Sequence, residues 1–188
     1  MALTALDPNT ALIIVDLQKG IVSLPLIHPA GDVIERACAL ADAFRERGLP
    51  VALVKVAGGA PGRTEQPRQT RSLPDGWTDL IPELNQQPSD IVVTKRTWGA
   101  FASTDLEAQL KARGVTQVVI AGVATGTGAE ATARQAYEQG FNVTLAIDAM
   151  TDMRPEAHDY SLKNVFPRLG ETGTSQEIID LLLTTRSA

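Results

Sequence analysis

The sequence predicts an α/β fold: a three-layer, doubly wound, mostly parallel sheet of about six strands. Five runs of apolar residues are nearly unbroken, which is typical of strands buried on both faces. Helical stretches lie between most of these runs and several end at a glycine. Strands and helices that alternate in this way are typical of a doubly wound α/β domain. The chain has 188 residues, so we expect a single domain over residues 1–188.

The predicted strands are rich in Val, Ile and Leu. They cover residues 11–15, 49–56, 90–94, 117–121 and 143–147. The first strand runs into Asp16, the third into Lys95, and the fourth into a glycine-rich turn at residues 122–128. Asp148 follows the fifth strand, where we expect it to hydrogen-bond nearby backbone groups, as Asp commonly does in a turn.

The predicted helices carry apolar residues at helical spacing, and the first three stop at a glycine. They cover residues 32–47, 104–113, 129–139 and 175–183. We expect Ser103 or Thr104 to cap the second helix. Residues 57–87 are rich in Gly, Pro and Arg and lie inside the alternation of strands and helices. A loop over one edge of the sheet is therefore favoured over a linker between domains.

Composition narrows the class of protein. No apolar run approaches the about 20 residues needed to span a bilayer, and the N-terminus lacks a signal pattern, so we expect a cytoplasmic protein without membrane contact. The one cysteine, Cys38, excludes an internal disulfide framework. A net charge of -5 argues against nucleic-acid binding, and two histidines with one cysteine argue against a zinc site. We expect no metal and no cofactor.

Ligands of open α/β sheets bind outside the carboxyl ends of the strands. Asp16, Lys95 and the backbone N–H groups of the 122–128 turn should therefore meet at one edge of the sheet. Burial raises the pKa of a carboxyl group and a neighbouring ammonium lowers it, so the balance decides whether Asp16 can donate a proton.

The glycine turn also approximates a phosphate-binding loop. Such loops normally follow the first strand of a dinucleotide-binding domain, whereas this turn follows the fourth strand. A nucleotide site is therefore disfavoured.

Three motifs of the chain resemble those of the isochorismatase-like hydrolase superfamily, also called the cysteine hydrolases. Residues 11–18 resemble the first strand with its catalytic aspartate, and residues 95–101 resemble the lysine segment. Residues 122–125 and 130–134 resemble the nucleophile motif G-V-A-T-N-x-C-V-E-x-T-A-R. The resemblance covers about residues 8–183 and implies this family's fold, a small-molecule substrate and homo-oligomerisation.

The resemblance implies a role for each matching residue. Asp16 would be the catalytic acid/base, Lys95 the charge that tunes it, and the Val123–Ala124 peptide a non-proline cis bond. The amide of Ala124 would then face the substrate as an oxyanion donor. The substrate contacts expected from the motifs come from Gln18, Trp98, Val123, Ala124 and Thr127.

Gly128 stands where the motif has its nucleophilic cysteine. Glycine offers no nucleophile, so the thiolate route of the amidase members is closed. Thr127 carries a hydroxyl but no histidine base is evident beside it, and Cys38 is favoured as a packed thiol within a helix.

Isochorismatases proper, and the vinyl-ether hydrolases of phenazine biosynthesis, also carry glycine at this position. They protonate a vinyl carbon, and water attacks the resulting oxocarbenium ion. The resemblance therefore implies a hydrolase that cleaves a vinyl-ether or related bond of a small, anionic metabolite, with Asp16 as the acid. Lys95 and one of Arg63, Arg68 or Arg71 would hold the anion. Residues 124–126 match the amidase branch instead, which leaves two alternatives: a binding protein that lost its nucleophile, and an amidase with another nucleophile.

Overall fold

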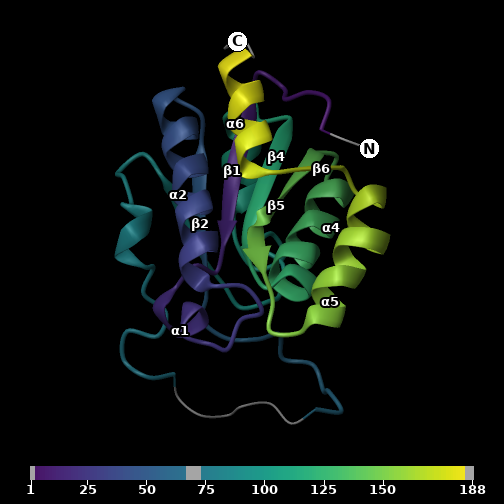
Figure 1. Cartoon of the computed structure of the whole chain (residues 1–188). Coiled ribbons are helices and arrows are strands. Elements are labelled where there is room, and N and C mark those ends of the chain that lie inside the picture. The colour runs from purple at the N-terminus through teal and green to yellow at the C-terminus, as the bar shows by residue number, and fades with distance from the viewer. Residues whose placement is uncertain (1–2, 67–72, 185–188) are drawn as a thin grey trace.

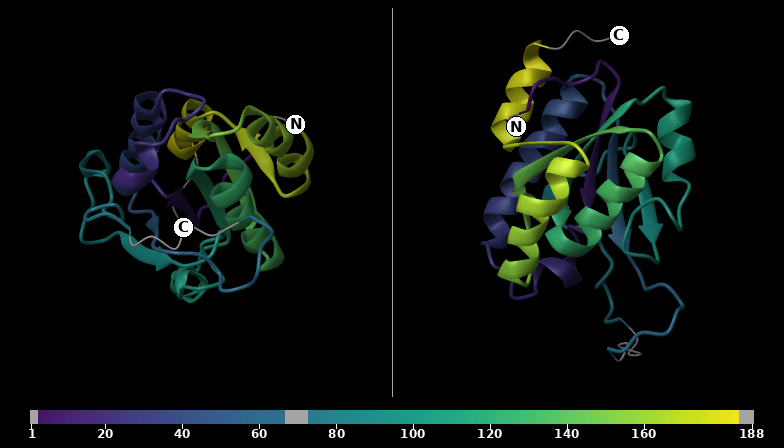
Figure 2. Two further views of the ribbon diagram at one scale, coloured as in Figure 1. Left: turned by 90° about the horizontal axis from the view of Figure 1, so that it is seen from below. Right: turned by 90° about the vertical axis from the view of Figure 1, so that its right-hand side faces the viewer.

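A computed structural model of the chain describes residues 3–66 and 73–184. Within these residues one six-stranded sheet has the order β3-β2-β1-β4-β5-β6, and all neighbouring strands are parallel. Helices cover both faces of the sheet (Figure 1, Figure 2), so the predicted three-layer α/β fold is confirmed. The strands are β1 (Thr10–Val15), β2 (Val51–Val56), β3 (Ile91–Lys95), β4 (Gln117–Val123), β5 (Asn142–Thr151) and β6 (Glu171–Gly173).

The unbroken apolar run of β1 reflects its burial on both faces. Ala11, Ile13 and Val15 pack into the core on one side of the sheet. Leu12 and Ile14 pack into the core on the other side. Since successive side chains of a strand point to opposite faces, a central strand of a covered sheet requires an apolar residue at every position.

Two helical layers complete these cores. The helices α2 (Ala30–Glu46) and α6 (Ser175–Thr184) pack on one face of the sheet. The helices α3 (Leu106–Ala112) and α4 (Glu130–Glu138) pack on the other face, and α5 (Pro155–Tyr160) lies beside α4 (Figure 1). Among the described residues, no helix combines the length and apolarity that a membrane crossing requires.

The element bounds differ from the prediction at several ends. The helix predicted from residue 104 begins at Leu106, and its N-cap is Asp105 rather than Ser103 or Thr104. Thr104 still accepts a hydrogen bond from the Leu106 N–H at Oγ1, over 3.2 Å. The strand predicted over 143–147 continues to Thr151, so Asp148 lies within β5 rather than in a turn. Its carboxylate accepts hydrogen bonds from the N–H and the hydroxyl of Ser175 at the start of α6.

The remaining differences are short elements that the sequence did not reveal. β6 has three residues and is mostly polar, while α1 (Lys19–Val22) has four residues. α5 has six residues, of which only His158 is buried. Such elements lack the periodic apolar pattern by which strands and helices are recognised.

The carboxyl ends of the strands converge on the edge where α1 and the segment between β2 and β3 lie, at the bottom of Figure 1. Gly122 allows β4 to approach β1 there, because a Cβ atom on Gly122 would collide with the backbone of Val15. The described parts of the 57–87 segment form the predicted loop, with a bridge between Gln18 and Leu80 and one 3₁₀ turn, Pro82–Leu84.

Candidate active site

A cavity of about 280 Å³ opens at this carboxyl edge. Asp16 directly follows β1, Lys95 ends β3 and Val123 ends β4. Gly128 lies in η2 (Thr125–Ala129), a π-helical turn between β4 and α4. All four residues line the cavity, so the topology brings together the groups that the sequence placed at the ends of three different strands.

Asp16 and Lys95 form a buried ion pair. The Nζ atom of Lys95 lies 2.8 Å from Oδ2 of Asp16, and the two residues are 1% and 5% exposed, respectively. The same Nζ atom donates to the carbonyl oxygen of Trp98 over 2.8 Å and to that of Thr97 over 3.3 Å. Because an ammonium group has three protons, these three acceptors occupy all of its donors.

The two oxygens of the Asp16 carboxyl group differ. Oδ2 contacts Lys95, whereas Oδ1 is buried and has no hydrogen-bond partner among the described residues. Burial raises the pKa of Asp16 to about 6, against the opposing effect of the Lys95 charge. Asp16 also has a φ of 54°, in the left-handed region that non-glycine residues adopt mainly at turns and functional sites.

Gly128 faces the Asp16 carboxylate directly. A Cβ atom built on residue 128 would lie 3.2 Å from Oδ2 of Asp16 and 3.1 Å from both the carbonyl oxygen of Val123 and Cγ1 of Val15. A side chain at position 128 would therefore project between the carboxylate and the end of β4. The peptide bond between Val123 and Ala124 is cis, as the family resemblance implies.

Side chains from beyond β5 hold the η2 turn in place. The Thr125 hydroxyl lies 2.8 Å from Nδ1 of His158, and the Gly126 N–H donates to Oδ2 of Asp152 over 2.8 Å. The His158 ring makes an edge contact with the His28 ring at a centroid distance of 4.9 Å. Burial lowers the pKa of His158, and the neighbouring His28 lowers it further. None of these supporting residues was predicted from the sequence.

Trp98, Ala124 and Thr127 also line the cavity, whereas Gln18 does not. The Gln18 side chain is fully buried and its amide bonds backbone groups on two segments. Its Oε1 accepts from the N–H of Val56 over 2.7 Å, and its Nε2 donates to the carbonyls of Val56 and Trp77. Gln18 thus ties the irregular segment to the end of β2, and its expected contact with substrate remains a prediction.

Sequence reasoning missed most of the apolar wall. The missed apolar side chains come from α1 and its flank, from the end of β2, from the irregular segment and from the residues after β5: Ile21, Leu24, Val56, Trp77 and Met153. The structure explains Gly20, because a Cβ atom there would collide with the Trp77 ring, but the sequence alone gives no sign of this contact.

The expected anion-binding arginine is not found among the described lining residues. Arg63 does not line the cavity, and Arg68 and Arg71 lie outside the described residues. Cys38 does not line it either; its partly buried thiol donates to the carbonyl oxygen of Glu83 over 3.2 Å. Within residues 3–66 and 73–184, no group of three or more His, Cys, Asp or Glu side chains is arranged to hold a metal ion.

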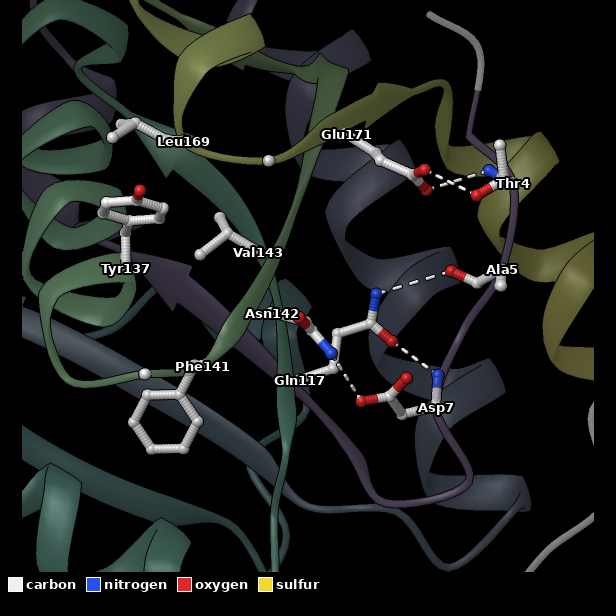
Figure 3. A pocket seen from close by; sticks show the side chains of 12 residues that line it. Thr4, Ala5, Asp7, Gln117, Tyr137, Phe141, Asn142, Val143, Leu169 and Glu171 are labelled. Atoms are coloured by element: carbon white, nitrogen blue, oxygen red, sulfur yellow. Dashed lines mark hydrogen bonds between the residues drawn. The ribbon is translucent and has the colours of Figure 1, made fainter.

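A larger hollow, of about 570 Å³, lies at the opposite edge of the sheet, around the first residues of β4, β5 and β6 (Figure 3). Its polar side chains bond one another and the backbone of the N-terminal segment. Glu171 accepts two hydrogen bonds from Thr4, and Gln117 bonds both the N–H of Asp7 and the carbonyl of Ala5. Asn142 donates to the carboxylate of Asp7 over 3.0 Å. These contacts hold the N-terminal segment against the sheet, so we assign the hollow a structural role rather than a binding role.

Known proteins share both the sequence pattern and the fold. Residues 10–177 match the model of the isochorismatase domain. The uncharacterized isochorismatase family protein YwoC of Bacillus subtilis is 40% identical over 92% of this chain and 93% of its own. Nicotinamidase 3 of Arabidopsis thaliana is 30% identical over 85% of this chain and 83% of its own. The structure of an isochorismatase family protein from Burkholderia thailandensis superposes with a TM-score of 0.91 at 40% identity, covering 95% of this chain and 98% of that one.

Proposed function

The chain belongs to the isochorismatase family of hydrolases, and we propose that it cleaves a vinyl-ether or related bond of a small molecule by proton transfer through Asp16. Water is the nucleophile, and no covalent enzyme intermediate forms. The observation that carries this proposal is the asymmetry of the Asp16 carboxyl group. One oxygen is held by Lys95, and the other is buried without a partner, in a group whose pKa is about 6.

The proposed reaction begins with Asp16 protonated. The C=C electron pair of the vinyl ether takes this proton at the terminal carbon, which leaves an oxocarbenium ion. Water adds to that cation and returns a proton to Asp16, and the resulting hemiacetal or hemiketal breaks its C–O bond to give a carbonyl compound and an alcohol. Lys95 stabilises the Asp16 carboxylate between these two proton transfers, in a site where low solvent access strengthens the attraction.

Gly128 supports the absence of a covalent step. It places no side chain between Asp16 and the cavity, and glycine has no nucleophilic atom. Thr127 is the nearest alternative, since its side chain lines the cavity, but neither histidine of the chain does. His158 is bonded to Thr125 instead. An amidase route through Thr127 therefore lacks a histidine base in the cavity.

The proposal is tested on two vinyl ethers. Pyruvate release from isochorismate is followed with lactate dehydrogenase, and acetaldehyde release from phenyl vinyl ether is followed with alcohol dehydrogenase. We expect turnover of at least one vinyl ether by the wild type and a rate at least about 100-fold lower by Asp16→Asn. Full activity of Asp16→Asn would refute the role of Asp16. No turnover of either compound would reject the vinyl-ether assignment and favour a protein that only binds its ligand.

Homo-oligomerisation, which the family resemblance implies, is part of this proposal. Light scattering coupled to size-exclusion chromatography measures it directly, and a mass of 20.0 kDa in solution would reject it.

A further inference from the structure

The cavity beside Asp16 has mainly apolar walls. Large apolar side chains reach it from five segments of the chain: Ile21, Leu24, Val56, Trp77, Trp98 and Met153. Trp98 is 70% exposed and Met153 is 48% exposed, so the outer part of this surface is open to water. Covering such side chains with an apolar ligand is favourable because it removes their surface from water.

The cation in this cavity has no donor left for a ligand. Lys95 is the one lysine or arginine that lines the cavity within the described residues. Its three protons are directed at Oδ2 of Asp16 and at the carbonyl oxygens of Trp98 and Thr97. A ligand carboxylate beside this pair would lose its hydration and gain no ammonium proton, and above pH 6, where Asp16 is ionised, it would also face a like charge.

The N-terminal end of the η2–α4 segment is also occupied. Backbone N–H groups at such an end attract anions. Here the carboxylate of Asp152 already accepts the N–H of Gly126, and its other oxygen accepts the N–H groups of Met153 and Arg154. The Gly126 N–H, one of the donors at this turn, is thus already taken by a carboxylate of the protein.

The size of the cavity limits the ligand further. Its volume of about 280 Å³ lies just below the range of about 300–1,000 Å³ found for sites that take drug-sized ligands. A single ring with a short substituent fits this space.

We infer that the substrate is a small, uncharged molecule with an apolar body of about one ring, held against Trp77, Trp98 and Met153. This inference rests on the proposed function, because it takes the Asp16 cavity as the active site. It departs from the anionic substrate that the family resemblance implies.

The chain itself supplies the reporter for the test. Its two tryptophans, Trp77 and Trp98, both line the cavity, so intrinsic fluorescence follows occupancy. Benzamide and benzoate have nearly the same shape and differ in charge. Titration of each at pH 8, confirmed by calorimetry, should give a Kd for benzamide at least about tenfold below that for benzoate. Equal or tighter binding of benzoate, or binding of neither compound, would overturn the inference.

Matched aromatic variants locate the binding. Trp98→Ala should weaken benzamide binding at least about fivefold, because it removes the most exposed apolar wall. Tyr160→Ala removes another exposed aromatic ring, 61% exposed and outside the cavity, and should leave the Kd unchanged. An equal effect of the two substitutions would overturn the assignment to this cavity.

The two proposals fail separately. Preferential binding of benzamide without turnover of either vinyl ether would sink the proposed reaction and leave the inferred ligand class standing. Turnover of isochorismate together with preferential binding of benzoate would uphold the reaction and reject the uncharged substrate.

Discussion

The Nζ atom of Lys95 lies 2.8 Å from Oδ2 of Asp16, where water reaches little of either side chain. The pair joins the end of β3 to the end of β1 across the intervening β2. It also leaves Oδ1 of Asp16 as the oxygen without a partner among the described residues. Three of the following predictions depend on this pair.

Asp16→Asn should lower kcat by about 10²–10⁴-fold, because an amide cannot transfer the proton that the reaction needs. The measurement is steady-state turnover of the vinyl ether found to react. Asp148→Asn is the matched control: Asp148 bonds Ser175 outside the cavity, so its loss should change stability and spare kcat. A similar loss of kcat in both variants would contradict a specific role for Asp16.

The pH dependence of kcat/KM should show one inflection near 6. Burial raises the pKa of Asp16 to about 6, and the proposed reaction requires the protonated carboxyl group. The rate should therefore be highest below this pH and fall as the pH rises through it. A rate that rises through the same range would identify Asp16 as a general base instead.

Lys95→Met should move that inflection to higher pH. The ammonium group favours the ionised carboxylate, so its removal leaves burial unopposed and raises the pKa of Asp16 further. Breaking a buried ion pair should also lower the free energy of unfolding by about 3–5 kcal/mol near pH 8. Lys19→Met breaks the exposed pair with Asp79 and should change stability by less than about 1 kcal/mol. An unmoved inflection in Lys95→Met would show that the titrating group is not Asp16.

Gly128→Cys should create a reactive thiol. Its Cβ would lie 3.2 Å from the Asp16 carboxylate, which can accept the thiol proton, and neighbouring atoms need to move by only a few tenths of an ångström. We expect iodoacetamide to label this thiol about tenfold faster than Cys38, whose pKa burial raises. Labelling rates by mass spectrometry, with and without Cys38→Ala, separate the two sites. Equal rates would mean that the cavity does not activate a thiolate.

His158→Gln should destabilise the protein by about 1–3 kcal/mol at pH 8, through loss of the buried contact with Thr125. Burial and His28 lower the pKa of His158 while Asp159 and Asp152 oppose them, so the unfolded chain takes up a proton first as the pH falls. The stability that neutral His158 contributes is thus present above its ordinary pKa of 6.5 and lost below it. Urea denaturation at pH 8 and 5.5 should show the difference between wild type and variant shrinking at the lower pH. A constant difference would exclude this titration.

The sequence predicts the layers of the fold and the central groups of the site because both follow from patterns along single segments. The apolar run of β1 requires cover on both faces, and parallel strands bring Asp16 and Lys95 to the same edge. No pattern along a single segment indicates the register shift between β4 and β5 at Ile120 and Gly122. The prediction therefore ended the fifth strand too early and wrongly placed Asp148 after it.

The walls of the site depend on contacts between distant segments and were therefore not predictable in the same way. Trp77 is held at the cavity by one hydrogen bond from Gln18 to its carbonyl oxygen, and its ring occupies the space that Gly20 leaves open. His158 supports η2 from a six-residue helix that carries few apolar residues. Contacts of this kind, between residues far apart in the sequence, leave no pattern within any single segment.

The contacts of Thr125 with His158 and of Gly126 with Asp152 fix the η2 turn without using the side chain of residue 128. The frame and the residue that it presents are thus separable: a relative could carry the same turn, acid and lysine and run a different reaction. Sequence identity and structural superposition report mainly on the turn and its surroundings, and hardly on the single residue at position 128. Transferring an activity between members of this family therefore requires reading that one position first, and a high percentage of identity is no substitute for it.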